Sequence, residues 1–309
     1  MIFFPYRVDM ELRRLPLVTL AVCIICVYVF LQQLHSYAQY QNAITTFCNQ
    51  QLDKKTRVIL RQLTEQQGNP PCADIFLAIR ESDNPEIAIQ TLVSQAAPLN
   101  LFKSREEELE YMLKGLRDAY HRFERNVPAN LTDELQFNPT ELKIKRMVTA
   151  VFSHGGWAHL IFNLVFFYAF AASVEVIVGS LVFSLIIVTM AVTTGLAYSL
   201  SVAGTPETAV PTIGLSGVVM GMMALLAVLA PKIKIRCFFW FLLLVRFFRL
   251  PALLLASWYV GWDIYHLMTQ QSANINFVAH VSGAGSGIII GMLYWYLRTD
   301  YVRHINAQT

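Results

Sequence analysis

Apolar runs long enough to cross a bilayer occur six times in this chain of 309 residues. A helix needs roughly 20 apolar residues to span a hydrocarbon core about 30 Å thick. Hydrophobic residues make up 55% of the sequence and its mean hydropathy is +0.45, which is high for a soluble protein. The sequence therefore predicts an all-α, polytopic membrane protein with a six-helix transmembrane bundle. The predicted spans are residues 15–34, 157–174, 180–200, 214–230, 251–269 and 278–297.

Most of the charge lies in one segment between the first two spans. Residues 37–147 contain 14 of the 24 Lys and Arg residues and 15 of the 21 Asp and Glu residues. The stretch SREEELEYMLKGLRDAYHRF opens with a Ser104–Glu107 capping box and repeats apolar residues at helical spacing. Shorter helices are expected at 43–66 and after a turn at 69–71. We expect a soluble, helical insert, and no nucleic-acid partner, because the basic residues alternate with acidic ones or flank apolar spans.

Basic residues indicate the orientation of the spans. Arg7, Arg13 and Arg14 precede the first span, which we interpret as an uncleaved anchor; the alternative is a signal peptide cleaved near the SYA at 36–38. Both interpretations place the insert outside the cytoplasm. The positive-inside rule then predicts that both termini are cytoplasmic, because the short outer loops contain neither Lys nor Arg. The remaining basic residues expected inside are Lys232, Lys234, Arg236, Arg246, Arg249, Arg298 and Arg303.

Four segments follow from this topology. They are an N-terminal tail with the first span (1–36), the insert (37–147), a core of five spans (148–297) and a cytoplasmic tail (298–309). Residues 237–250, CFFWFLLLVRFFRL, are apolar enough to resemble another span. Two arginines and a following proline favour an interfacial segment instead.

Five cysteines are present, and two of them lie in the insert. If the insert faces an oxidising compartment, Cys48 and Cys72 are candidates for a disulfide across the turn; two buried free thiols are the alternative. Cys23 and Cys26 lie within the first span, where lipid offers no water for thiolate chemistry, so we interpret them as packing residues.

Four polar side chains lie in the spans, where lipid gives them no hydrogen-bond partner. His159 and Asn163 are four residues apart in the second span, so both project from one helix face. Ser216 lies in the fourth span and His280 in the sixth. With the N-terminus inside, all four lie within the first two turns from the outer end of their helices. The topology therefore predicts that three helices bring these groups to one level.

Small residues recur every four positions on two of these helices. Such ridges let helix backbones approach closely. If they face each other, Ser216 and His280 come within hydrogen-bond reach; taken alone, the ridges only pack helices. The ridge residues are Gly217 and Gly221 on the fourth span, and Ala279, Gly283, Gly287 and Gly291 on the sixth.

Three motifs resemble the signature regions of the rhomboid intramembrane serine proteases. They are FSHGGWAHLIFNLVFFYAFAASVE, IGLSGVVMG and AHVSGAGSG, in that order on the second, fourth and sixth spans. The resemblance covers about residues 139–297. It implies a rhomboid-like bundle in which Ser216 is the nucleophile and His280 its general base. His159, Asn163 and the Ser216 amide would form the oxyanion hole.

The resemblance also implies supporting positions and shows two departures. Members of the family often carry, four residues after the serine, a tyrosine that packs on the catalytic histidine. Met220 occupies that position here, so we expect a looser histidine rather than loss of activity. The first external loop is much longer than in typical bacterial members and lacks their usual Trp-Arg pair. The supporting positions are His154 at the mouth of the site, Gly214 and Gly217 beside the serine, Met220, and Gly283 and Gly287 after the histidine.

The sequence shows no carboxylate that clearly orients His280. Apart from the boundary residue Glu175, the acid within a span is Asp263 in GWDIYHLM. Asp263 and His266 could supply a third triad member and a proton relay, but a place toward the outer end of the fifth span favours contact with water. We therefore expect a Ser-His dyad, which is slower than a full triad. Without HExxH or a carboxylate cluster, neither a metal nor a cofactor is expected.

The resemblance implies that the substrates are single-span membrane proteins with small or helix-breaking residues near their outer end, entering from the bilayer beside the fifth span. The alternative is a noncatalytic rhomboid-like protein that binds membrane helices in quality control. Such relatives usually lack the serine or the histidine, and both are present here. A transporter would show internal repeats or broken midplane helices.

The insert could recruit a protein partner, and we expect a bacterial inner membrane with the insert and active site facing the periplasm.

Overall fold

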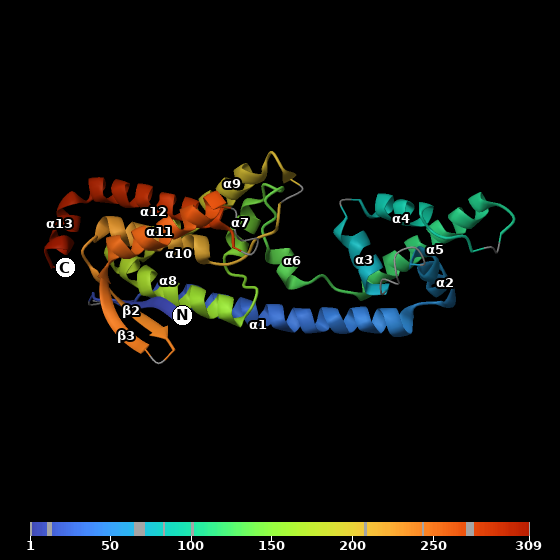
Figure 1. Cartoon of the computed structure of the whole chain (residues 1–309), viewed down its shortest axis with the longest axis horizontal. Coiled ribbons are helices and arrows are strands. Elements are labelled where there is room, and N and C mark those ends of the chain that lie inside the picture. Colours follow the sequence, from blue (N-terminus) through green and yellow to red (C-terminus); the bar gives the residue numbers. More distant parts are fainter. Residues whose placement is uncertain are drawn as a thin grey trace. The chain divides into compact units, whose positions relative to one another are not determined.

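The chain forms two compact units, each with its own core (Figure 1). The computed structural model describes residues 2–10, 14–64, 72–82, 84–99, 102–206, 209–242, 244–269 and 275–308. Residues 1–33 and 132–309 belong to the first unit, here called the membrane unit. Residues 34–131 form the second, here called the insert. Arg13 and the expected turn at 69–71 lie outside the described residues.

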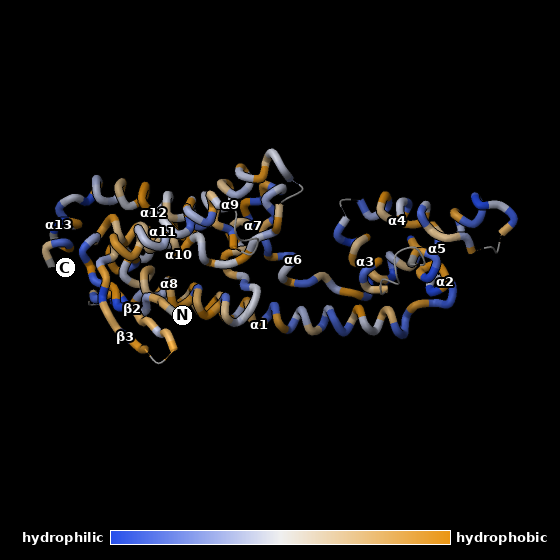
Figure 2. Tube along the Cα trace, in the orientation of Figure 1, coloured by the Kyte–Doolittle hydropathy of each residue, from blue (hydrophilic) through white to orange (hydrophobic). Residues whose placement is uncertain are grey.

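Helices account for most of the membrane unit, as predicted. Each predicted span coincides with a helix. These are α1 (Leu17–Thr46, which ends in the insert), α8 (Trp157–Val178), α9 (Ser180–Val202), α10 (Ser216–Leu229), α11 (Ala252–Thr269) and α12 (Phe277–Leu297). Among the described residues, four of them, α1, α8, α9 and α12, are long and apolar enough to cross a membrane; α10 is a shorter apolar helix. The chain is therefore an integral membrane protein. Figure 2 shows apolar residues recurring along the helices of the membrane unit.

Helix α10 lies at the centre of this unit. Nearly all of its residues are buried, which is typical of a helix that is apolar on every side. Its closest neighbour is α12, at the predicted glycine ridges. A Cβ atom on Gly283 would lie 2.1 Å from the Gly217 carbonyl oxygen, and one on Gly287 would lie 2.1 Å from that of Gly221. The two backbones are therefore in direct contact, and only glycine fits at these positions.

A carboxylate joins α1 to α8. Glu175 is only 2% exposed and accepts hydrogen bonds from Val18 N at 3.0 Å, Thr19 N at 2.8 Å and Thr19 Oγ1 at 2.8 Å. Ser180 Oγ, at the start of α9, donates a fourth at 2.7 Å. The first N–H groups of a helix have no partner within it, and a negative charge at that end is favourable. Glu175 therefore caps α1 from the neighbouring helices.

A three-stranded antiparallel sheet is the main departure from the predicted all-α fold. Strand β2 (Lys234–Phe241) pairs with β1 (Ile2–Val8) on one side and with β3 (Leu244–Pro251) on the other. The predicted interfacial segment at 237–250 is thus a β-hairpin. Ile235 and Cys237 anchor it to the core of the membrane unit. Figure 1 shows the sheet and α13 (Thr299–Gln308) at the same end of this unit.

The insert is helical, but its boundaries differ from those expected. Its helices are the last turns of α1, a π-helical turn (Phe47–Gln51), α2 (Lys54–Thr64), α3 (Cys72–Glu81), α4 (Pro85–Ser94) and α5 (Arg105–Asn126). The single helix expected at 43–66 is interrupted at Leu52, whose backbone is extended. Ser104 Oγ accepts the Glu107 N–H at 3.2 Å, as the capping box predicts. Phe47, Phe76 and Phe123 pack their rings together in the centre of the insert.

The segment after residue 131 belongs to the membrane unit rather than to the insert, which was expected to end at 147. The short helix α6 (Leu131–Leu135) is followed by Phe137, which is buried with Met147 and Ala150 of α7 (Ile144–Ala150). Burial of this large ring accounts for the shift in the boundary, because buried apolar area stabilises the segment where it packs.

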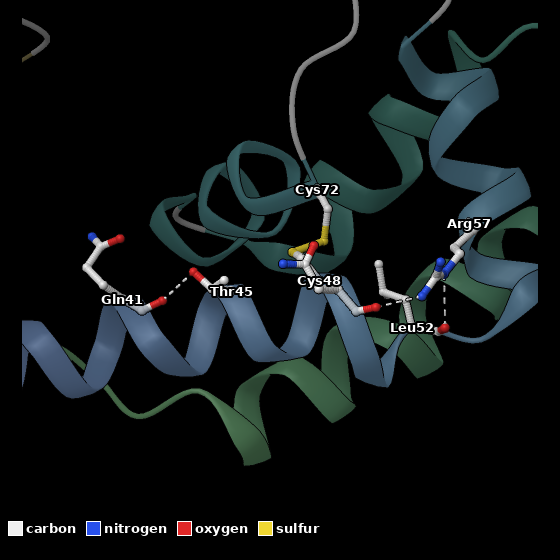
Figure 3. Close-up of a disulfide and its surroundings, with 7 residues drawn as sticks. Gln41, Thr45, Cys48, Leu52, Arg57 and Cys72 are labelled. Carbon is white, nitrogen blue, oxygen red and sulfur yellow. Dashed lines mark hydrogen bonds between the residues drawn. A yellow bond between two sulfur atoms is a disulfide. The ribbon is translucent and has the colours of Figure 1, made fainter.

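The two insert cysteines are bonded to each other. Cys48 Sγ and Cys72 Sγ are 2.03 Å apart, joining the π-helical turn to the start of α3 (Figure 3). Arg57 donates to the carbonyl oxygens of Leu52 and Asn49 at 3.2 and 2.9 Å, and so holds the adjoining bend of the chain.

Candidate active site

Ser216 is the first residue of α10, and its position is set by the turn before it. Gly214 has φ +115°, a conformation that residues with a side chain rarely adopt. Its N–H donates to the Ala150 carbonyl at 2.9 Å. Two residues before Gly214, Thr212 exchanges backbone hydrogen bonds of 2.9 and 3.0 Å with Phe137. The loop is therefore fixed from two sides, and the Ser216 N–H lies in the first turn of α10, where helical N–H groups have no acceptor within the helix.

His159 lies against this turn. A Cβ atom on Gly214 would lie 2.7 Å from His159 Cε1 and 2.8 Å from its Nε2. His159 Nδ1 accepts the Gly155 N–H at 3.3 Å, so in the neutral ring the proton is on Nε2. Nε2 is thus a donor directed toward the segment that ends in Ser216.

Asn163 lies one turn along α8 from His159. It is only 7% exposed, and its Nδ2 donates to the His159 carbonyl at 2.9 Å. An amide nitrogen has two hydrogens, so one remains for another acceptor. Asn163 also lines the cavity described below, which places that hydrogen within reach of a bound group.

His154 lies beside His159 in the folded chain. It is 2% exposed, and its N–H donates to the buried Gln33 side chain at 3.0 Å. Its ring meets that of His159 edge to face, with centroids 5.2 Å apart. Burial, and secondly the charge of neighbouring His159, lowers the pKa of His154 to about 4, so it is neutral near pH 7.

His280, in the first turn of α12, is held by a carboxylate that the sequence did not assign to it. Its Nδ1 lies 2.9 Å from Asp263 Oδ2 on α11. Phe277 meets the His280 ring edge to face at 6.1 Å. Met220, at the position where the family often has tyrosine, is buried and lines the same cavity. The looser histidine stays a prediction, and the structure adds a hydrogen bond between His280 and Asp263 that the tyrosine position does not supply.

The expectation that Asp263 simply meets water is wrong. Asp263 is 7% exposed, so most of its surface is covered by protein. The sequence places it on the fifth span but gives no sign of which side it faces, because almost every side of that helix is apolar. His266 lines the cavity and stacks on Phe277 at 5.2 Å, whereas its Nδ1 has no partner in the described part of the chain.

One cavity of about 470 Å³ brings most of these groups together, but His154 and His159 are not among the residues that line it. It lies among α8, α10, α11 and α12. Its polar lining comprises Asn163, Ser216, Asp263, His266 and His280, and its apolar lining includes Phe162, Phe166, Val219, Met220, Tyr259 and Trp262. No hydrogen bond joins Ser216 Oγ to His280 among the residues that the structure describes. In unliganded enzymes such contacts are often long and tighten only when substrate binds.

Fold and site together define a class: an integral membrane protein whose helical bundle encloses a serine, a histidine and amide donors around one cavity. A family model for the rhomboid domain matches residues 141–297, just over half of the chain. The protein therefore belongs to the rhomboid family, whose members are usually intramembrane serine proteases. Comparison with curated proteins gives no match.

Proposed function

We propose that this chain is an intramembrane serine endopeptidase that cleaves the transmembrane segments of single-span membrane proteins. The observation that carries the proposal is the shared cavity, onto which Ser216, His280 and Asn163 all open. Ser216 Oγ attacks the scissile carbonyl carbon while its proton passes to His280 Nε2. The same proton then goes to the leaving amine nitrogen as the C–N bond breaks, and water hydrolyses the acyl-enzyme.

The oxyanion that forms on attack needs donors fixed in advance. His159 Nε2–H, the second Asn163 amide hydrogen and the Ser216 N–H supply three from two helices. Such donors typically contribute about 100- to 1,000-fold each to kcat. The His159 ring is fixed in direction, because it lies between Gly155, whose N–H it accepts, and Gly214.

The depth of the serine follows from the length of α10. Its 14 residues extend about 21 Å, less than the roughly 30 Å of a bilayer core. Asn306 Nδ2 donates to the Leu229 carbonyl at 2.9 Å, which ties the far end of α10 to α13, beyond the last span. If that end lies at the inner surface, Ser216 lies below the outer surface, and the cavity admits the water that hydrolysis requires.

The arrangement of charge supports cytoplasmic termini, with the active site and the insert on the periplasmic side of a bacterial inner membrane. Arg7, Arg236 and Arg249 occupy paired positions across the sheet, at the end of the unit that also carries α13. Basic residues are enriched on the cytoplasmic side of membrane proteins. The insert, which has its own core, is free to recruit a protein partner.

Cleavage in vesicles tests the proposal. The full-length protein is reconstituted with a single-span substrate that carries helix-breaking residues near its outer end. We expect the wild-type protein to release two fragments, and Ser216→Ala and His280→Ala to release none. Binding of the substrate without cleavage by any of the three proteins would favour a noncatalytic rhomboid-like protein that binds membrane helices.

A further inference from the structure

Two buried carboxylates in the membrane unit differ in what they contact. Glu175 accepts four hydrogen bonds from main-chain and hydroxyl donors, none of which is titratable, and its role is to cap a helix. The Asp263 carboxylate has one hydrogen-bond partner among the described residues, His280 Nδ1. Both members of this pair are largely covered, with side chains 10% and 16% exposed.

We propose that Asp263 is the positioning residue for His280, so that this protein works as a Ser-His-Asp triad instead of a dyad. This inference rests on the proposed function. A carboxylate oxygen only accepts hydrogen bonds, so the 2.9 Å contact places the imidazole proton on Nδ1. His280 Nε2 then carries a lone pair, which is the state needed to accept the Ser216 proton.

The bond also stabilises the charge that appears during the reaction. When the proton leaves Ser216 Oγ for Nε2, the ring becomes an imidazolium with protons on both nitrogens. Asp263 keeps its own charge and holds the Nδ1 proton throughout; it takes no proton from the ring. When Nε2 gives its proton to the leaving nitrogen, the starting tautomer is restored, so the proton count balances over each half of the reaction.

Position 220 explains why this chain needs such a residue. Met220 cannot hold the imidazole plane as an aromatic ring would, and Phe277 contacts His280 only at its edge. The hydrogen bond that holds the ring instead comes from Asp263 on α11, a different helix from that of Met220. Helix α11 also lines the cavity. Any movement of α11 that breaks the contact between Asp263 and His280 frees the imidazole ring to rotate. The position of α11 therefore controls the orientation of the His280 ring.

The test compares Asp263→Asn with wild type in full-length, reconstituted protein. Removing the orienting carboxylate of a serine-protease triad lowers kcat by about 10⁴. We expect a loss of about 100- to 10,000-fold in kcat with KM within about threefold, because Asp263 acts on the chemistry and not on substrate binding. An unchanged kcat, or a loss confined to KM, would overturn the proposal.

A matched control and a double variant separate positioning from folding. Glu175→Gln makes the same acid-to-amide change at a buried structural carboxylate; we expect a lower unfolding temperature but a kcat within about twofold for the folded protein. In the His280→Ala background, where no cleavage is expected, the readout is the residual fluorophosphonate labelling of Ser216. Asp263→Asn should lower that labelling no further, because groups that act as one unit are not additive. An equal further loss there would show that Asp263 acts independently of His280.

A spectroscopic measurement reads the histidine directly. In ¹⁵N NMR of histidine-labelled protein we expect the His280 proton on Nδ1 in the wild type. In Asp263→Asn, where the amide can donate to Nδ1, we expect the proton on Nε2. The same tautomer in both proteins would overturn the proposal. The NMR measurement does not need turnover, so it separates failure of the triad from failure of the proposed protease activity. Failure of the protease activity would show as wild-type protein that is no more active than Ser216→Ala.

Discussion

At the scale of single residues, the active site depends on places where no side chain fits. Gly214 combines a φ of +115° with ring atoms of His159 less than 3 Å from where a Cβ would lie. The same glycine joins the loop to Ala150 through its N–H. One small residue therefore sets both the approach of the chain to Ser216 and the position of His159, the proposed oxyanion donor.

We predict that Gly214→Ala lowers cleavage at least about tenfold, since a misplacement of about 1 Å in a catalytic group can cost about 100-fold. The added methyl group must displace His159 or the turn. Gly156→Ala is the matched control, because Gly156 is extended and has no atom within 4 Å of its Cβ position. Cleavage assays on both variants, with thermal unfolding to confirm folding, decide the matter; equal activities would contradict the prediction.

The sequence predicted the individual site residues unevenly, for a physical reason. Four site residues lie in motifs, and the spacing of each motif along its own helix already limits the direction of the side chains. These residues are Ser216, His280, His159 and Asn163. Asp263 has no such motif, and its contact with His280 joins two helices at an angle that the sequence does not contain. Rotation of α11 about its own axis decides whether that carboxylate meets water or an imidazole.

At the scale of secondary-structure elements, the contact between α10 and α12 determines the geometry of the site. Their backbones touch at Gly217–Gly283 and at Gly221–Gly287. Both contacts follow Ser216 on α10 and His280 on α12. A change in the separation of the two helices therefore changes the distance between Ser216 and His280.

Gly283→Ala should destabilise the membrane unit, since its Cβ would lie 2.1 Å from a backbone oxygen that cannot move aside. Overpacking typically costs about 1–3 kcal/mol, so we expect a lower unfolding temperature in detergent and reduced cleavage. Gly285→Ala, on the same helix but with open space at its Cβ position, should be neutral or slightly stabilising. If Gly283→Ala unfolded at the same temperature as Gly285→Ala, the close contact would be disproved.

Elements were predicted from the sequence where the apolar pattern had a single explanation. Runs such as 157–178 are too long for a strand, so the helices were expected. The run at 237–250 is short, aromatic and apolar on both faces, so periodicity alone does not separate strand from helix or interfacial segment. Its partner β1 is remote in sequence, and pairing of Phe3 with Phe239 depends on the folded arrangement of helices α1 and α10 that brings the two segments together.

At the scale of the whole molecule, two cores fold within one chain. The insert packs around Phe47, Phe76 and Phe123, whereas the membrane unit packs around α10. The sequence indicated this division by its apolar spans and by the concentration of charge between the first two of them. It placed the end of the insert too late, because the charged stretch continues past residue 131 although Phe137 is buried in the other unit.

We predict that the Cys48–Cys72 disulfide stabilises the insert without affecting the chemistry. The bridge closes a sequence separation of 24 residues, for which the loop-entropy model gives about 3.5 kcal/mol. Changing both cysteines to serine should make the insert more sensitive to limited proteolysis, while the wild-type cleavage rate is retained. Cys23→Ser, outside the insert, is the control. Equal proteolysis of all three proteins would show that the bridge contributes nothing.

The central claim is that Ser216 is a nucleophile activated by His280 inside the membrane unit. The most direct measurement is reaction of the purified protein with a fluorophosphonate, followed by mass spectrometry of the peptide that contains residue 216. We predict a single phosphonyl adduct on Ser216 in the wild type, none in Ser216→Ala and little in His280→Ala. Absence of an adduct from the wild type, or equal labelling of all three proteins, would contradict the claim.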